Sequence, residues 1–339
     1  MIVLGIESSC DETSVAVIVD DELKANLISS QDFHKNYGGV IPELSSRAHL
    51  QMIVPLFKNA LSLAGIDKTQ IDVVGATAGP GLIGSLLVGL NFAKGLSYAL
   101  NKPFVPVNHL EGHIFSGFLM DEKPEFPYLC AVVSGGHSLL LNVKSFTEIE
   151  KLGTTIDDAA GEAFDKVAKL LGFGYPGGPL IQKAAEKGDE TKIDFPVAQC
   201  KNEFDFSFSG LKTAVLRHVQ KNYDDPRNIP ENERNDVAAS FQRAVANALT
   251  SKAKKVLRRQ RFKALSVVGG VAANNYIRKS FEEIAEKENL KLVVPKLEYC
   301  GDNGAMIAFR AKTLHEAGRK YSLDYQAFPS MKKLNFNFE

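Results

Sequence analysis

Strong charge of one sign is absent from this sequence of 339 residues. Lysine plus arginine and aspartate plus glutamate number 40 each, so the formal net charge at neutral pH is zero. A chain that bound nucleic acid or an anionic membrane through its overall charge would need a clear basic excess. Any contact with nucleic acid must therefore come from a local basic patch.

Closely spaced cysteines are also absent. The four cysteines lie far apart, at Cys10, Cys130, Cys200 and Cys300, and none forms a CxxC pair. This spacing favours neither a disulfide framework nor a zinc ribbon. We expect reduced, mostly structural thiols.

A long uninterrupted apolar run is missing as well. The longest candidate is Leu82–Leu100, which glycine and polar residues interrupt, among them Asn91 and Lys94. We therefore expect no membrane-spanning segment and no membrane partner. The amino terminus lacks the basic and then apolar segments of a signal peptide, so the cytoplasm is the expected location.

What is present is an ordinary globular composition with a repeated pattern. Hydrophobic residues make up 45% and charged residues 24%, and the length favours two domains or lobes. Two apolar runs, Ile2–Ile6 and Val15–Val19, enclose the polar turn Ser8–Ser14. The pattern recurs where Tyr128–Val133 leads through a polar turn to a second apolar run. Two strand–turn–strand units, each followed by helices, indicate an internally duplicated α/β fold.

The periodicity also predicts further elements and domain limits. Helices are expected at residues 45–63, 158–171, 236–259, from about 273, and at 303–317, with Asp236 as a helix cap. Short strands are expected at residues 73–76, 104–107, 265–268 and 292–294. We assign residues 1–108 plus about 302–325 to one lobe, 109–301 to a second with an insertion near 172–235, and 326–339 to a tail.

Several turns have the composition of a nucleotide site. The turns Ser8–Ser14 and Ser134–His137 could direct backbone N–H groups and hydroxyls at phosphates, although each alone is also typical of a surface hairpin. Gly269 and Gly270, just before Asn274, let a ligand approach the backbone closely. Asn274 could instead be a simple helix cap, and Asp165 a solvated residue on a helix face.

The segment NHLEGHIF carries a possible metal site in the pair His109 and His113. On a helix, residues four apart lie on one face, which is a chelating arrangement, although histidines so spaced also serve as core or capping residues. Glu111 lies two residues after the first histidine, which does not match the zinc-protease motif. Asp302 could supply a third ligand or could cap the following helix. Two imidazoles and one carboxylate suit Fe(II), with Zn(II) or Mn(II) as alternatives.

A basic segment follows at Ser251–Lys263, with seven cations and no acid. Cations at the carboxyl end of a helix are favoured by the helix dipole, which is one interpretation. Contact with RNA phosphates is the other, through Lys254, Lys255, Arg258, Arg259 and Arg261.

Seven segments together resemble one family, the TsaD/Kae/Qri family of tRNA threonylcarbamoyladenosine-forming transferases. They are GIESSCDETSVAVI, NHLEGHIF, VVSGGHSLL, GEAFDKVAKLLGFGYPGGP, FSFSGLKTA, VVGGVAANN and YCGDNGAMIA, and the resemblance covers about residues 1–325. It implies the actin, Hsp70 and sugar-kinase (ASKHA) fold, an actin-like ATPase fold of two lobes with a central nucleotide cleft.

The resemblance also implies a reaction and a set of site residues. The family moves a threonylcarbamoyl group from threonylcarbamoyl-AMP to N6 of the adenosine beside the anticodon in tRNAs that read ANN codons, and AMP is released. One metal, usually iron, is implied at His109, His113 and Asp302. The donor site is implied at Val132, Val133, Ser134, Gly135, Gly136, Asp165, Gly178 and Asn274. Asp11, Glu12 and His137 lie in matching loops, with Asp11 and Glu12 as catalytic candidates.

The implied partners are tRNA, threonylcarbamoyl-AMP, a TsaB-like paralogue and a TsaE-like ATPase. Two other functions remain open at this point. A small-molecule kinase or ATPase of the same fold would phosphorylate a metabolite and would not need the histidine pair. A non-enzymatic actin-like nucleotide switch would bind partners without modifying tRNA.

Overall fold

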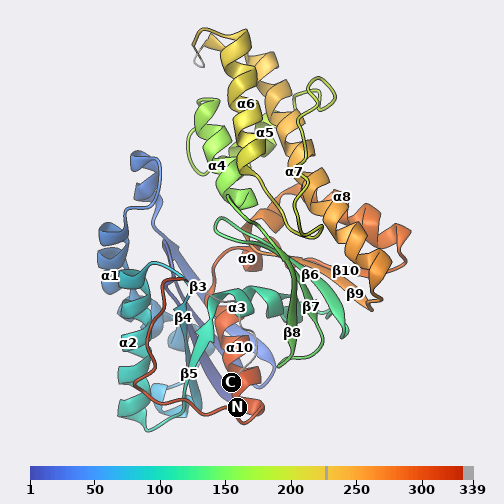
Figure 1. Ribbon diagram of the computed structural model, residues 1–339. Helices are drawn as coiled ribbons and strands as arrows, with labels where there is room; N and C mark the ends of the chain where they lie inside the picture. Colours follow the sequence, from blue (N-terminus) through green and yellow to red (C-terminus); the bar gives the residue numbers. More distant parts are fainter. Residues whose placement is uncertain (226–227, 331–339) are drawn as a thin grey trace. The chain divides into compact units, whose positions relative to one another are not determined.

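The computed structural model describes residues 1–225 and 228–330, which form two compact units (Figure 1). Unit 1 contains Met1–Asp121 and the described residues from Pro295 onward, and unit 2 contains Glu122–Val294. Part of the expected tail, residues 331–339, lies outside the described residues.

Unit 1 is built on a sheet of five strands in the order β3-β2-β1-β4-β5. Strands β1, β2 and β3 form an antiparallel meander, and β4 and β5 add in parallel beside β1. The strands span Ile2–Glu7, Glu12–Val19, Glu22–Ser30, Val73–Gly79 and Phe104–Asn108.

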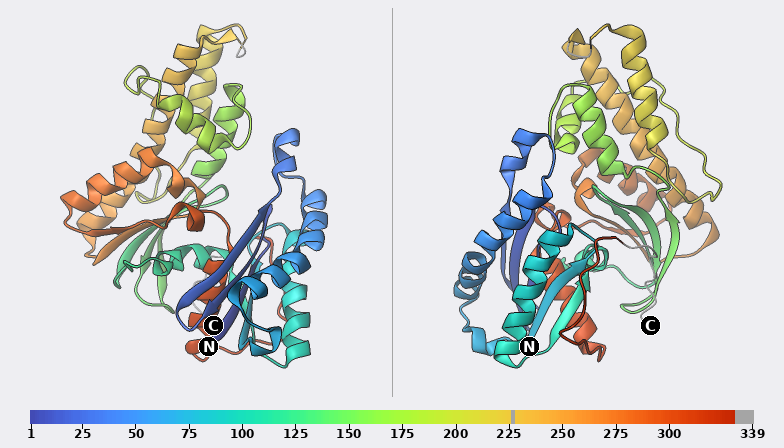
Figure 2. Two further views of the ribbon diagram at one scale, coloured as in Figure 1. Left: turned by 180° about the vertical axis from the view of Figure 1, so that it is seen from behind. Right: turned by 60° about the vertical axis from the view of Figure 1, so that its left-hand side comes forward.

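Helices cover both faces of this sheet (Figures 1 and 2). Side chains such as Leu4 and Ile6 pack in one core cluster with Ile53 of α1 and Leu90 of α2. On the other face, a Cβ atom built at Gly5 would lie 2.3 Å from the backbone of α10, so only glycine lets this helix approach so closely. The helices span Pro42–Ala64 (α1), Ile83–Leu100 (α2), His109–Phe115 (α3), Leu297–Cys300 (α9) and Gly304–Glu316 (α10).

Unit 2 repeats this topology, which confirms the predicted duplication. Its sheet has the order β10-β9-β6-β7-β8, with an antiparallel meander from β6 to β8 and parallel strands β9 and β10. In each unit, the first strand of the meander therefore lies at the centre of the sheet. The strands span Tyr128–Val133, Ser138–Val143, Ile149–Thr154, Ala264–Val268 and Lys291–Val293.

The helices of unit 2 include the longest in the described part of the chain, α7. They span Ala160–Leu170 (α4), Gly177–Ala185 (α5), Ser209–Asn222 (α6), Glu231–Arg259 (α7) and Asn275–Lys287 (α8). Asp236 lies inside α7 and does not cap it, contrary to the prediction, and its carboxylate accepts a hydrogen bond from the Asp189 N–H at 2.7 Å. Pro230 occupies the N-cap position instead, and no side chain caps the helix there.

The limits of the two units differ from the expected division at three places. Residues 326–330, expected to belong to a separate tail, lie in unit 1, where the Phe328 N–H donates to the Ala78 carbonyl at 2.9 Å. Residues 109–121 belong to unit 1 because α3 packs on β5 and α10. Residues 295–301 belong there too, and the Lys296 N–H lies 3.3 Å from the Met120 sulfur. The ligand candidates His109, His113 and Asp302 therefore all lie in one unit.

The segment Leu82–Leu100 was expected to be too interrupted by glycine and polar residues to reach the length of a membrane span, but it forms the long helix α2. It runs without a break over 18 residues and is long and apolar enough to cross a membrane by length and composition alone. Its small residues serve packing, since a Cβ atom at Gly89 would lie 2.3 Å from the Ser8 hydroxyl and one at Gly84 would lie 2.4 Å from that of Ser46. The helix packs on β4 and α1, as core helices of globular domains do.

Candidate functional site

The histidine pair lies on a short helix at the carboxyl end of β5. The Asn108 side chain caps α3 by accepting a hydrogen bond from the Leu110 N–H at 2.9 Å. His109 and His113 then face the same side, with ring centroids 4.8 Å apart, and both are buried. The structure therefore agrees with the helical spacing expected from the sequence.

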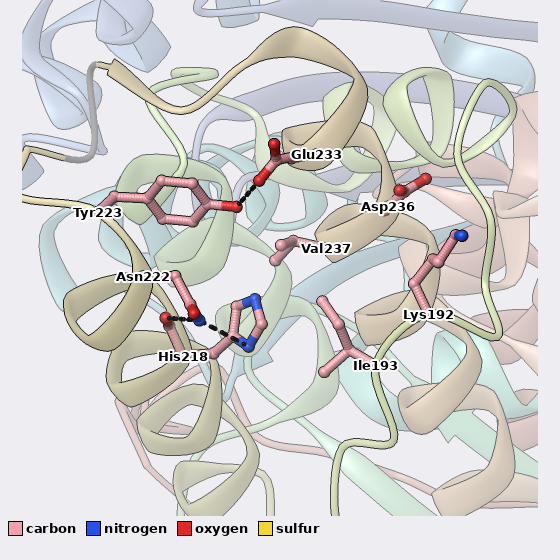
Figure 3. A pocket seen from close by; sticks show the side chains of 8 residues that line it. All are labelled: Lys192, Ile193, His218, Asn222, Tyr223, Glu233, Asp236 and Val237. Atoms are coloured by element: carbon pink, nitrogen blue, oxygen red, sulfur yellow. Dashed lines mark hydrogen bonds between the residues drawn. The ribbon is translucent and has the colours of Figure 1, made fainter.

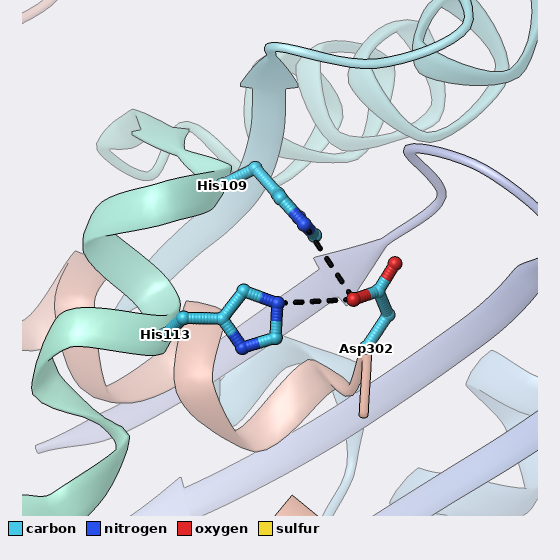
Figure 4. Close-up of side chains that lie close together, drawn as sticks. All are labelled: His109, His113 and Asp302. Carbon is cyan, nitrogen blue, oxygen red and sulfur yellow. Dashed lines mark hydrogen bonds and ion pairs between the residues drawn. The ribbon is translucent and has the colours of Figure 1, made fainter. Parts of the chain in front are cut away.

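Asp302 meets these imidazoles from the far end of the chain (Figure 4). Its Oδ1 lies 3.0 Å from Nε2 of His113 and 3.5 Å from Nε2 of His109. One donor atom from each of the three side chains lies within 4.8 Å of the others. The cap of α10 is the neighbouring Asn303, whose Oδ1 accepts from the Met306 N–H at 3.0 Å, so Asp302 is not needed as a cap.

Acidic groups surround this cluster. Burial lowers the pKa of His109, but the carboxylates of Asp302 and Glu7 raise it by more, to about 9. Burial, together with the charges of Asp302 and Asp11, raises the pKa of Glu12 to about 10. Carboxyl groups that suppress one another's ionisation mark a place where a cation would be stabilised. The donor set of two imidazole nitrogens and a carboxylate oxygen fits a divalent metal.

Glu7 is a residue that sequence reasoning missed. It ends β1, its side chain is fully buried, and its Oε2 lies 3.1 Å from Nδ1 of His109. The signal was available, because an acidic residue closes an otherwise apolar strand directly before the polar turn. Buried carboxylates are rare unless they are paired or bind a metal ligand.

Asp11 lies in the turn that follows β1, and Glu12 is the first residue of β2. Both are half-buried, and the Asp11 carbonyl accepts a hydrogen bond from the Gln31 N–H at 3.1 Å. Neither belongs to the three-residue cluster, but the charge of Asp302 acts on Glu12. Glu12 therefore lies close enough to Asp302 for their charges to interact within the same unit.

A separate pocket of about 310 Å³ lies in unit 2. Four of the predicted donor-site residues line it, namely Gly135, Asp165, Gly178 and Asn274. The remaining lining residues are Gly161, Phe164, Pro176, Pro179, Gln182, Gly270, Val271 and Ala273. The segments GEAFDKVAKLLGFGYPGGP and VVGGVAANN thus come together around one hollow, which has the size of a small-ligand site.

The polar residues of this pocket also stabilise its walls. Oδ1 of Asp165 accepts a hydrogen bond from the Gly177 N–H at 2.7 Å and so fixes the start of α5. Asn274 caps α8 through the Ile277 N–H, and its amide donates to the buried Gln242 at 2.8 Å. The capping interpretation of Asn274 is therefore correct, and the same residue lines the pocket.

The other predicted donor-site residues lie on the strand and turn before the pocket. Val132 and Val133 are buried in β6, where their side chains pack in the core. The turn that follows is closed by a hydrogen bond from the Ser134 N–H to the His137 carbonyl at 2.8 Å. Gly136 is exposed on this turn, and Gly161 approaches Ser134 so closely that a Cβ atom would lie 2.7 Å from its carbonyl.

A second hollow in unit 2, of about 340 Å³, lies among α6, α7 and the loop before them (Figure 3). Its polar groups bond to one another: the Tyr223 hydroxyl donates to Glu233, and the Asn222 amide donates to the His218 carbonyl at 2.8 Å. None of the site residues predicted from the sequence lines it. The hollow is therefore a feature of the helical insertion.

Comparison with known sequences gives one consistent result. The family described as TsaD, tRNA N6-adenosine threonylcarbamoyltransferase, matches residues 22–309. A protein of that name from Thermosipho africanus is 50% identical over 98% of this chain and 100% of its own length. Another from Symbiobacterium thermophilum is 47% identical over 97% of this chain and 96% of its own length.

Solved structures agree on the fold. HypF from T. kodakarensis superposes with a TM-score of 0.65 at 15% identity, over 93% of this chain and 48% of HypF. Component A of the (R)-2-hydroxyglutaryl-CoA dehydratase from Acidaminococcus fermentans gives 0.55 at 18% identity, over 94% of this chain and all of that one. The fold is thus the duplicated actin-like ATPase (ASKHA) fold expected from the resemblance.

Proposed function

The chain belongs to the TsaD family of tRNA N6-adenosine threonylcarbamoyltransferases, and on that premise we propose that its donor is threonylcarbamoyl-AMP. As an enzyme of this family it forms threonylcarbamoyladenosine in tRNA. The acceptor we propose is the adenosine beside the anticodon of tRNAs that read ANN codons, with AMP as the second product. The cytoplasm, where tRNA is found, is the proposed location.

The pocket of unit 2 is the proposed site of the adenylate. At Gly135, Gly178 and Gly270 the space that a Cβ atom would occupy is open, so a phosphate can approach the backbone closely there. The carboxylate of Asp165 can accept hydrogen bonds from ribose hydroxyls. Phe164 offers an apolar wall to the base. These features suit a nucleoside monophosphate better than a free sugar or an amino acid.

The cluster in unit 1 is the proposed metal centre. His109, His113 and Asp302 would hold one divalent cation, and Fe(II) is our first choice, with Zn(II) or Mn(II) as alternatives. A cation bound there supplies a Lewis acid that stabilises negative charge on a carbonyl or phosphate oxygen. The single observation that carries this proposal is the convergence of three ligand atoms from two distant parts of the sequence, without a capping role for Asp302.

The reaction itself requires little covalent chemistry from the chain. The N6 amine attacks the carbamoyl carbonyl carbon, the bond from that carbon to the phosphate oxygen breaks, AMP leaves, and N6 gives up one proton. No nucleophilic side chain is required, and proximity of the two substrates supplies much of the acceleration. Asp11 and Glu12 are the proposed catalytic residues. A cation held by Asp302 would favour the ionised form of Glu12 and let it accept that proton.

The proposed protein partners are a TsaB-like paralogue and a TsaE-like ATPase. Helices α1 and α2 expose Leu50, Val54 and Leu87, which are 64%, 43% and 42% accessible. These side chains and their neighbours line a hollow of about 480 Å³ between the two helices. A contiguous apolar surface across two helices supports docking of another protein, and we assign it to the paralogue.

Reconstitution tests this function. Purified protein receives threonylcarbamoyl-AMP and an unmodified ANN-reading tRNA transcript, with and without the paralogue and the ATPase, and nucleosides from the digested RNA are measured by mass spectrometry. We expect threonylcarbamoyladenosine, and we expect His109→Ala to lower its rate of formation by about 100-fold or more. His315→Ala, which removes a half-buried imidazole at the end of α10 in the same unit, is the matched control and keeps the rate.

The outcomes separate this proposal from its rivals. Absence of the modified nucleoside in every partner combination would refute transfer from threonylcarbamoyl-AMP. Normal turnover of His109→Ala, together with ATP-dependent phosphorylation of a metabolite, would instead identify a kinase of the same fold.

A further inference from the structure

Glu7 occupies an unusual place among the described residues of unit 1. It lies at the carboxyl end of β1, between the strand that bears Thr77 and the turn that bears Ser9, and its side chain is fully buried. Its Oε1 accepts a hydrogen bond from the Ser9 N–H at 2.6 Å, and its Oε2 accepts one from the Thr77 hydroxyl at 2.6 Å. No lysine or arginine pairs with it in the described part of the chain.

The third neighbour of this carboxylate is a candidate metal ligand. Oε2 of Glu7 lies 3.1 Å from Nδ1 of His109. The opposite nitrogen of the same ring, Nε2, faces Asp302, whose Oδ1 lies 3.5 Å away. The ring thus stands between a buried carboxylate and the proposed cation site, with one nitrogen toward each.

His113 provides an internal contrast. Its Nε2 also faces Asp302, at 3.0 Å, but its Nδ1 is buried and has no hydrogen-bond partner among the described residues. Among the described residues, only His109 therefore has a carboxylate at the ring nitrogen opposite the proposed cation site. The difference cannot arise from the helix, because both histidines lie on α3.

We propose that Glu7 is a positioning residue that fixes the Nδ1–H tautomer of His109 and so keeps its Nε2 lone pair directed at the cation. The inference rests on the metal centre proposed above. The Ser9 hydroxyl also lies 3.2 Å from Nδ1 of His109, and it can accept as well as donate. A carboxylate only accepts hydrogen bonds, so contact with Glu7 requires Nδ1 of His109 to be the donor. A hydrogen-bonded carboxylate behind a metal-bound imidazole fixes the ring and raises the basicity of the ligand nitrogen.

Both oxygens of Glu7 accept hydrogen bonds, which makes Glu7→Gln an informative substitution. A glutamine has one acceptor oxygen in place of two. If that oxygen takes the Ser9 N–H, the amide N–H₂ faces His109 and favours the Nε2–H tautomer, which cannot bind a cation through Nε2. If the glutamine oxygen instead faces His109, the amide N–H₂ faces the Ser9 N–H, and two donors meet without an acceptor. Either arrangement weakens the metal site while changing the side-chain volume little.

The first measurement is the affinity of the full-length protein for Co(II), followed by the visible absorption of the bound ion. We expect Glu7→Gln to weaken binding by about 10- to 100-fold. Thr77→Val is the matched control, because it removes a hydrogen bond from the same carboxylate and leaves the hydrogen bond to His109 in place. It should lower the melting temperature while keeping the Co(II) affinity within about threefold of wild type.

The second measurement needs no variant and guards against a Glu7→Gln protein that fails to fold. In the Zn(II)-loaded wild type with ¹⁵N-labelled histidine, long-range ¹H–¹⁵N correlation shows which ring nitrogens carry a proton. We expect His109 to have a protonated Nδ1 and a metal-bound Nε2. A metal-bound Nδ1, or an unchanged Co(II) affinity in folded Glu7→Gln, would overturn the role of Glu7 while the metal centre stands. A wild type that binds neither Co(II) nor Zn(II) would overturn both proposals.

Discussion

His49 is a fully buried imidazole on α1 that contacts Cys10 in the turn after β1 and Thr13 at the start of β2. Its Nδ1 lies 2.7 Å from the Thr13 hydroxyl and its Nε2 lies 3.0 Å from the Cys10 carbonyl oxygen. The Ser45 hydroxyl donates to the same carbonyl and links α1 to α2 through Ser85. Burial lowers the pKa of His49 below its ordinary value of 6.5, and the Cys10 carbonyl only partly offsets this effect.

This lowered pKa predicts an acid-sensitive contribution to stability. Below about pH 6.5 the unfolded chain binds a proton at His49, which the folded chain binds less readily. The contribution of His49 to the free energy of unfolding is therefore fully present above that pH and is lost as the pH is lowered. Urea unfolding of wild type and His49→Gln between pH 8 and about pH 5 tests this expectation, since glutamine does not titrate there. The variant should lose less stability over this range, whatever its stability at pH 8.

The control for this measurement is His315→Gln, on the same unit but half-buried at the end of α10. It should follow the wild-type pH dependence. Parallel curves for wild type and His49→Gln would show that His49 does not carry the effect.

At the scale of elements, a buried ion pair joins the two helices that bring the ligand candidates together. Arg310 of α10 is fully buried, and its Nε and one terminal nitrogen each lie 2.7 Å from Oε2 of Glu111 on α3. The guanidinium also stands 4.5 Å from the centroid of the Phe115 ring. Burial raises the pKa of Glu111, while the charge of Arg310 acts to lower it.

Removing one member of this pair should therefore cost more than removing both. We expect Arg310→Met to lower the free energy of unfolding by about 3–5 kcal/mol, because it leaves a buried carboxylate without its partner. The double variant Glu111→Leu with Arg310→Met should recover part of this loss. Chemical denaturation of both proteins measures the difference, and equal losses would show that the pair is not coupled.

The sequence predicted the elements that carry strong periodicity and missed those that do not. The two strand–turn–strand units and the main helices follow from apolar patterns, and so does the duplication. Strands β3 and β8 were missed because polar residues interrupt their apolar pattern, whereas the edge strands β5 and β10 have short apolar runs and were predicted. Asp302 could not be separated from a helix cap by sequence alone, since Asp and Asn are both good caps and Asn303 follows directly.

Site residues divide in the same way into those that local patterns predict and those that depend on distant contacts. His109 and His113 could be predicted because their spacing is local, and Gly135, Asp165, Gly178 and Asn274 because of the resemblance. The contacts of Glu7 with His109 and of Arg310 with Glu111 could not, because the partners are about 100 or more positions apart in the sequence. Only the parallel placement of β1 and β5 on either side of β4 brings Glu7 to His109.

At the scale of the whole molecule, zero net charge means that tRNA must be held by a local surface. The basic segment at the carboxyl end of α7 is the predicted surface, and the structure refines it. Lys255, Arg258 and Arg261 are exposed and form no ion pair with an acid in the described part of the chain. Arg259 is instead paired with Glu203 at 2.5 Å and stacks over Phe204, so we expect it to contribute less.

Within unit 2 this surface and the pocket lie at opposite ends of strand β9. Helix α7 ends just before β9 begins, whereas Gly270 and Asn274 follow the end of that strand. Five residues of strand separate the two by about 16 Å. Basic residues so placed cannot touch a base bound in the pocket, so we expect them to hold the phosphate backbone of the tRNA elsewhere along its length.

This separation predicts how charge reversal should act. Lys255→Glu with Arg258→Glu should weaken tRNA binding and lower the slope of log affinity against log salt by about two, one for each phosphate that these side chains no longer neutralise. The affinity for an adenylate analogue such as AMP should stay unchanged, because the pocket is remote. Lys279→Glu with Lys287→Glu on α8 gives the same change in net charge on the same unit and should leave the salt slope as it is. If both pairs weaken tRNA binding equally, long-range charge and not this surface governs binding, and if only the AMP affinity falls, the segment belongs to the pocket.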